Sequence, residues 1–136
     1  MAVDRNDSVV PERSCVAAAG GTFFEVLRQK AAADSSFAAK NAFTYLNDGE
    51  HISGSISFSE LDRAARGIAA NLQRLTQPGD RVLLVLPPSL DYIIAFFGCI
   101  YAGVVAVPAL PPANSRTFPR LQFIARDAAP TAAIGS

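Results

Sequence analysis

The 136-residue sequence has little of what metal centres and disulfide scaffolds need, with two cysteines, one histidine, one methionine and no tryptophan. Two cysteines, Cys15 and Cys99, cannot form the set of bridges that staples a small secreted domain. Together with His51 they give three of the four ligands of a structural zinc site, so such a site would need carboxylates as well. We therefore predict no metal site and no disulfide framework.

An excess of charge of one sign is also missing. Twelve lysines and arginines balance twelve aspartates and glutamates, and only 18% of the residues are charged. Domains that bind nucleic acid normally carry a basic patch, so we expect no nucleic-acid partner. Half of the residues are hydrophobic, which excludes disorder for most of the chain. At this length, the composition predicts one domain with a substantial core.

The N-terminal residues lack the features of a secretory signal. The first fifteen include five charged side chains and no apolar h-region. We interpret residues 1–20 as a disordered tail and expect a cytoplasmic protein.

The longest apolar run, Tyr92–Leu110, has the length of a candidate membrane span. However, a cluster of valines follows Gly103, and prolines follow the valines from Pro108 onward. These residues divide the run into a helix of about 13 residues, too short to cross a bilayer, and a strand. We therefore expect no membrane span.

The first half of the chain predicts a hairpin between two helices. Thr22 with Glu25, and Ser57 with Glu60, each form the spacing of a capping box at a helix start. The first helix is expected to fray near residues 34–36. Between the helices, strands at 42–46 and near 56–58 flank an Asn-Asp-Gly turn. The second helix should turn Leu61, Ala64, Ala65, Ile68, Leu72 and Leu75 inward.

The second half predicts a βαβ unit over Arg81–Ala109. Five consecutive apolar residues after Arg81 are typical of a parallel strand covered on both faces. Ser89 caps a deeply buried helix, Gly103 ends it in the left-handed conformation, and a strand follows to Pro108. A further helix, with Leu121, Ile124 and Ala125 inward, and a strand over 131–134 complete the pattern. The fold class is α/β, with a hairpin followed by βαβ units and a partly parallel sheet.

No catalytic constellation is visible in the residue types. The sequence has no Gly-rich loop with Lys and Ser or Thr, no Gly-x-Ser-x-Gly elbow and no acidic pair placed for proton transfer. We interpret His51 as a solvated loop residue and Cys99 as an inert buried thiol. Arg63, Arg66 and Arg74 fit a solvated helix face. We assign no catalytic, cofactor-binding or metal-ligating residue.

Three segments carry a family resemblance. Ser57–Leu61 resembles the first core motif of the acyl-adenylate-forming enzymes, and Gly79–Val82 looks like their next shared segment. Ile100–Pro108 resembles their second core motif, in which an Ala-Gly pair leads into a Val-Pro strand end. The longer run over 79–112 is most similar to the fatty acyl-AMP ligases, and the resemblance extends over residues 22–136. It implies the N-terminal portion of the large adenylate-forming domain.

What the resemblance implies is ATP-dependent activation of a fatty acid. In such ligases the carboxylate attacks the α-phosphate of ATP, with magnesium neutralising phosphate charge. The acyl group of the adenylate then passes to an acyl carrier protein for lipid, polyketide or lipopeptide synthesis. The family's phosphate loop, ribose-binding Asp and catalytic Lys have no counterpart in this sequence. We therefore expect residues 21–136 to be an incomplete segment, inactive alone, whose partner is the remaining ligase segment or a carrier protein.

Two alternatives remain open. The chain could be a non-enzymatic interaction module derived from the same fold, which uses a sheet edge or an apolar face to bind a partner. It could also be a small membrane-associated protein that uses Tyr92–Leu110.

Overall fold

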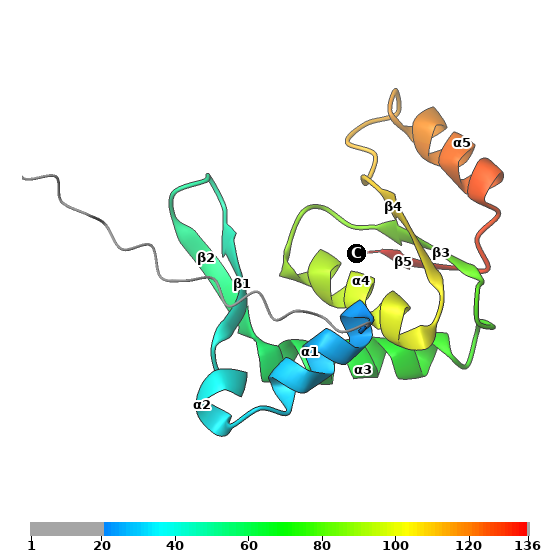
Figure 1. Cartoon of the computed structure of the whole chain (residues 1–136). Helices are drawn as coiled ribbons and strands as arrows, with labels where there is room; N and C mark the ends of the chain where they lie inside the picture. Colours follow the sequence, from blue (N-terminus) through cyan, green and yellow to red (C-terminus); the bar gives the residue numbers. More distant parts are fainter. Residues whose placement is uncertain (1–20, 136) are drawn as a thin grey trace, which may run out of the picture.

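The computed structural model describes residues 21–135, so the predicted tail over 1–20 lies outside the described residues. Along the chain the elements are α1 (Phe23–Ala31), α2 (Ser35–Ala38), β1 (Asn41–Leu46), β2 (Ile52–Ser57), α3 (Phe58–Leu72), β3 (Arg81–Val85), α4 (Leu90–Ala102), β4 (Val105–Ala109), α5 (Phe118–Ala128) and β5 (Ala132–Gly135) (Figure 1). Within this described part, every helix is too short or too polar to cross a bilayer. The α/β class and the hairpin are as predicted.

Both predicted capping boxes are present. The Glu25 carboxylate accepts a hydrogen bond from the Thr22 backbone N–H at 2.7 Å, and the Thr22 hydroxyl accepts one from the Glu25 N–H at 3.3 Å. Ser57 and Glu60 make the same reciprocal pair at 2.9 and 3.3 Å. Each box satisfies N–H groups that have no partner within their helix, which fixes the starts of α1 and α3.

The helix α2 was not predicted from the sequence. Asp34, interpreted as the frayed end of the first helix, instead caps a new turn, and its Oδ1 accepts a hydrogen bond from the Phe37 N–H at 2.9 Å. The Phe37 ring then stacks on that of Phe58 with 5.7 Å between centroids. A four-residue helix is too short to be stable alone, so this contact with the start of α3 holds it.

The strands β1 and β2 form an antiparallel hairpin that packs on α3 and α4. Gly49 has a φ of +85° in the turn, and the Asn47 N–H donates to the His51 carbonyl oxygen at 3.2 Å. The Phe43 ring lies 6.1 Å from that of Phe97 on α4, which ties the hairpin to the rest of the molecule.

Three parallel strands form the second sheet, in the order β4-β3-β5. Val82, Leu83 and Leu84 of the central strand are at most 5% exposed, as the apolar run predicted. Gly79 and Gly103 adopt φ of +88° and +74°, in the turn before β3 and at the end of α4 respectively. The βαβ unit and the left-handed end of α4 are therefore confirmed.

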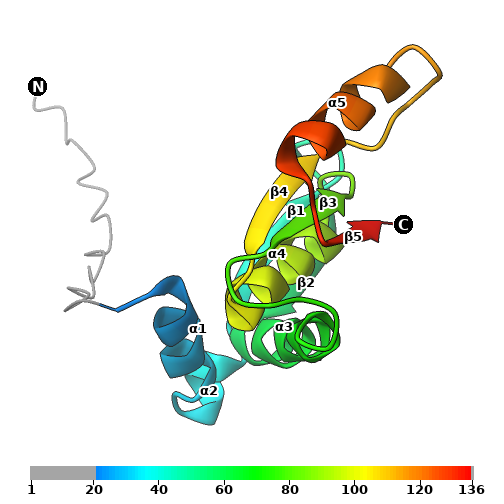
Figure 2. The same ribbon diagram turned by 90° about the vertical axis from the view of Figure 1, so that its right-hand side faces the viewer.

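The two crossover helices lie on opposite sides of this sheet. The crossover through α4 runs from β3 to β4, and the crossover through α5 runs back from β4 to β5 on the other side of β3. Because these two right-handed crossovers run in opposite directions across the sheet, they place α4 and α5 on opposite faces. In Figure 2, α3 lies below the strands, with α4 above α3, and α5 lies at the top. The Arg81 Nη1 donates to the Ala128 carbonyl oxygen at 3.1 Å, which fastens the end of α5 to β3.

Two hydrophobic clusters form the core, and α4 contributes to both. Its side chains are less buried than predicted. Ala95, Gly98, Cys99 and Ala102 are buried, whereas the larger side chains of the helix are half-buried.

Two predictions about single residues are wrong. Leu75 was expected to face inward, but it is 69% exposed because α3 ends at Leu72 and Leu75 lies in the turn that follows. Phe58 was expected to extend the second hairpin strand, but it is the first residue of α3, because the predicted capping box of Ser57 and Glu60 starts the helix directly after Ser57.

Candidate functional site

A groove of about 470 Å³ opens at the carboxyl ends of β3 and β4. Leu86 and Pro88 follow β3, and residues 110–113 follow β4, so the loops that leave the two strands form its base. The helices that follow these strands lie on opposite faces of the sheet. Such a switch point is where open α/β sheets usually bind ligands.

The walls of the groove are mostly apolar, and three polar side chains interrupt them. Tyr92 comes from the first turn of α4, Thr117 from the N-cap position of α5, and Arg120 from the first turn of α5. Of these, only Arg120 is charged, and none of the described lining residues is acidic. The groove therefore suits a largely apolar ligand with an anionic end.

Local hydrogen bonds order the backbone that carries these polar side chains. The Ser89 hydroxyl accepts from the Tyr92 N–H at 3.2 Å, which fixes the start of α4. The Asn114 Oδ1 accepts from the N–H groups of Arg116 and Thr117 at 3.0 and 3.2 Å. This Asx turn orders the end of the Pro-rich loop and sets the direction in which α5 begins.

The groove does not fit a magnesium–nucleotide complex by itself. Magnesium prefers carboxylate and phosphate oxygens, and the lining offers no carboxylate. Within residues 21–135, no three His, Cys, Asp or Glu side chains are grouped to hold a metal ion.

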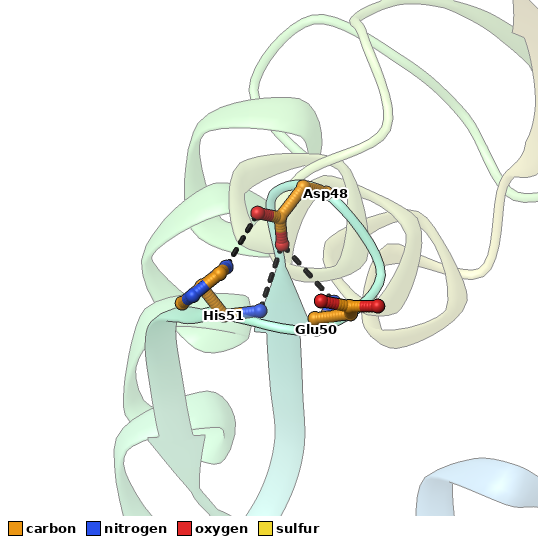
Figure 3. Close-up of polar contacts among 3 residues, drawn as sticks. All are labelled: Asp48, Glu50 and His51. Atoms are coloured by element: carbon orange, nitrogen blue, oxygen red, sulfur yellow. Dashed lines mark hydrogen bonds and ion pairs between the residues drawn. The ribbon is translucent and has the colours of Figure 1, made fainter.

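His51 lies in the hairpin turn, where its side chain is 80% exposed. Its Nδ1 lies 2.5 Å from the Asp48 Oδ2, and the Asp48 Oδ1 accepts from the N–H groups of Glu50 and His51 at 3.0 and 2.7 Å (Figure 3). These backbone hydrogen bonds, with the one to the imidazole, lower the pKa of Asp48 to about 2. The prediction of a solvated loop histidine is confirmed.

The other singled-out residues also occupy the environments predicted for them. Cys99 is fully buried, and burial raises the pKa of its thiol to about 11, so the thiol stays protonated and unreactive. Arg63, Arg66 and Arg74 are exposed on or beside α3.

Sequence reasoning missed the groove because its residues are apolar or isolated. The order of the predicted elements could have indicated the groove, because the loops that follow consecutive parallel strands meet at the same edge of the sheet. The side chains of Tyr92 and Arg120 lie on helices that begin just after such loops.

The fold defines the class as an α/β domain, with an antiparallel hairpin and an open parallel sheet that has a groove at the carboxyl ends of its strands. Residues 30–136 match the family model described as AMP-binding enzyme. Because this match covers most of the chain, the protein belongs to the AMP-binding enzyme family.

Two curated relatives refine this assignment. The chain is 47% identical over 93 residues to the medium-chain-fatty-acid–[acyl-carrier-protein] ligase JamA of Moorena producens, a match that covers 66% of this chain and 16% of that protein. It is 42% identical over 76 residues to the long-chain-fatty-acid–AMP ligase FadD32 of Mycobacterium marinum, covering 56% of this chain and 12% of that protein.

A solved structure agrees with these sequences. The fatty acid AMP ligase from Legionella pneumophila superposes with a TM-score of 0.72 and 38% identity, over 81% of this chain and 18% of that one. The predicted resemblance to fatty acyl-AMP ligases is therefore confirmed. The chain spans only about a sixth of the length of JamA.

Proposed function

We propose that residues 21–136 act as the N-terminal segment of a fatty acyl-AMP ligase that uses ATP and magnesium to activate a fatty acid for an acyl carrier protein. The observation that carries this proposal is the 38% identity to the Legionella pneumophila ligase across 81% of the chain, with the same backbone course. JamA, at 47% identity, is named for transfer to an acyl carrier protein. The cytoplasm, where ATP is available, is the compartment we propose.

The groove supports a role in binding the fatty acid. Its apolar walls match a hydrocarbon chain, and its volume of about 470 Å³ lies within the range of roughly 300–1,000 Å³ typical of ligand pockets. The guanidinium of Arg120 offers charge-assisted hydrogen bonds to an anionic group. The residues that bind ATP and magnesium then belong to the remaining ligase segment.

A chimera tests this proposal. Residues 30–135 would replace the matching segment of the Legionella pneumophila ligase, and fatty-acid-dependent ATP–pyrophosphate exchange would be measured. We expect exchange by the chimera and none by the 136-residue chain alone. A folded chimera without exchange would show that the segment does not serve this function, and exchange by the chain alone would contradict its predicted inactivity.

The second candidate is a non-enzymatic interaction module. It is supported by large apolar side chains that are more than two-thirds exposed, which are Phe23, Ile52, Leu75 and Phe123. These side chains lie on or beside different elements, and each of them could contribute to a contact with a partner. An autonomous module should melt in one transition that coincides by fluorescence and circular dichroism, whereas a broad, probe-dependent melt counts against it.

A further inference from the structure

A second pocket, lined by both polar and apolar side chains, lies where α1, α3 and α4 meet, and its volume is about 210 Å³. Phe24 and Arg28 reach it from α1, Arg66 and Gln73 from α3 and its C-terminal end, and Tyr101 from α4. The groove described above is lined by other residues, at the carboxyl ends of β3 and β4. Nothing in the proposed ligase function uses this second pocket.

Two hydrogen bonds to the Asp62 carboxylate hold Tyr101 and Arg66 in place on one side of the pocket. The Tyr101 hydroxyl donates to the Asp62 Oδ1 at 2.8 Å, and the Arg66 Nη2 donates to the Asp62 Oδ2 at 2.8 Å. Asp62 is only 8% exposed, and these two hydrogen bonds supply one partner to each oxygen of its buried carboxylate. The Arg66 side chain remains 57% exposed, and its other N–H groups can reach a ligand.

Arg28 stands on the other side, against an aromatic wall. Its guanidinium carbon lies 5.6 Å from the centre of the Phe24 ring, and that ring meets Tyr101 edge-on at 4.6 Å and 79°. Among residues 21–135, no carboxylate lies within ion-pair distance of Arg28. A cation held by a ring face alone keeps its hydrogen-bond donors available.

The guanidinium groups of Arg28 and Arg66 both line the pocket and both influence the Tyr101 phenol electrostatically. Burial and the hydrogen bond to Asp62 raise the pKa of the Tyr101 phenol, and the positive charges of Arg66 and Arg28 both oppose that rise. Asp62 neutralises one of the two cations. The pocket therefore carries one net positive charge, a neutral phenol and an aromatic wall.

We propose that this pocket binds the phosphate group of a small organic phosphate. A carboxylate offers two oxygens, whereas a phosphate monoester offers three and more negative charge, so it can accept from two forks that come from different helices. The amide of Gln73 supplies a further donor. The rings of Phe24 and Tyr101 contact the organic part, and the small volume limits that part to about the size of one ring.

Nuclear magnetic resonance of the ¹⁵N-labelled, full 136-residue chain tests the proposal. Phenyl phosphate is the probe, and inorganic phosphate and benzoate are titrated at matched ionic strength and pH. We expect saturable shifts of the backbone amides around Arg28, Ala69 and Tyr101 with phenyl phosphate, and weaker binding of both other anions. Equal affinity for benzoate would overturn the preference for phosphate, and equal affinity for inorganic phosphate would overturn the role of the aromatic wall.

Two variants complete the design. Arg28→Gln removes an exposed cation without breaking an ion pair, and it should weaken phenyl phosphate binding roughly tenfold or more. Arg63→Gln, an exposed position on α3 outside the pocket, should leave the affinity unchanged. The proposal is wrong if the chain shows no saturable shifts, or if Arg28→Gln binds as tightly as Arg63→Gln.

Discussion

At the scale of the residue, the contact between α3 and α4 depends on a position that has no side chain. Gly98 of α4 lies against Ile68 of α3, and a Cβ atom added at position 98 would lie 2.6 Å from the Ile68 Cβ. Interatomic contacts of this length do not occur, so α3 and α4 can approach this closely only with glycine at the crossing. Gly67, exposed on α3, has nothing within 4 Å of the same added atom.

These two glycines should therefore respond oppositely to alanine. Gly98→Ala forces the helices apart and should lower the free energy of unfolding by about 1–3 kcal/mol. Gly67→Ala removes only backbone freedom from the unfolded chain and should raise it by roughly 0.5–1 kcal/mol. Urea unfolding of both variants measures the difference, and a stabilised Gly98→Ala would refute the tight helix crossing.

Asp48 gives a pH-dependent prediction at the same scale. Its pKa in the folded chain is lowered from the usual 3.8 to about 2, so its contribution to stability is complete above its unfolded pKa and is lost as the pH falls through about 2. Asp48→Asn should therefore destabilise the chain most above pH 4, and the difference should shrink through about pH 2 and vanish only below it. Chemical unfolding as a function of pH tests this, and a constant difference across the range would exclude the predicted linkage.

At the scale of the element, two helices end in the left-handed conformation with different residues. Gly103 ends α4 with a φ of +74°, which suits glycine, whereas Ala129 ends α5 with a φ of +43°, which strains an alanine. The handedness of L-residues makes this conformation cost alanine about 1 kcal/mol more than glycine. The end of α5 is therefore less stable with Ala129 than it would be with a glycine at this position.

The exchange of residues at these two ends should have opposite effects. Gly103→Ala should lower the free energy of unfolding by about 1 kcal/mol, and Ala129→Gly should raise it by a similar amount. The nearest atom to a Cβ at position 103 is 3.9 Å away, so the effect there reports backbone strain alone. Thermal unfolding distinguishes the signs, and a destabilised Ala129→Gly would contradict the strain at the end of α5.

Elements were predicted where the signal is local, and missed where it is not. Capping boxes, turn glycines and apolar runs lie within a few residues, so Thr22, Gly49, Ser57 and Gly103 could be assigned from the sequence. The helix α2 depends on the contact of Phe37 with a ring across the fold, which no local pattern contains. Both pockets join residues from separate elements, so only the three-dimensional arrangement reveals them.

At the scale of the whole molecule, the exposed apolar side chains predict self-association of the isolated chain. Phe123 of α5 is 75% exposed, beside a sheet whose outer strands have unpaired edges within the described residues. Surfaces and edges of this kind pair with other copies when no partner covers them. The same surface is available to the remaining ligase segment in the proposed complete enzyme.

Phe123→Glu should reduce this association, because it removes an exposed ring and adds a charge. Gln122→Glu adds the same charge at a neighbouring exposed position without removing apolar surface, and serves as the control. Sedimentation velocity at several concentrations should give a smaller apparent mass for Phe123→Glu only. Equal behaviour of the two variants would mean that the ring does not drive association.

The sheet order also determines when the molecule can be completed during synthesis. Val82 of the central strand β3 pairs with Ala106 of β4 on one side and with Ala132 of β5 on the other. Ala132 lies fifty positions after Val82 in the sequence. The edge of β3 that pairs with β5 therefore has no partner strand until nearly the last described residue has been synthesised. The hairpin and the α3–α4 pair, in contrast, form between elements that are close together in the sequence. Non-local parallel pairing of this kind is slow, so the nascent chain is exposed to aggregation for longest at β3, its most hydrophobic strand.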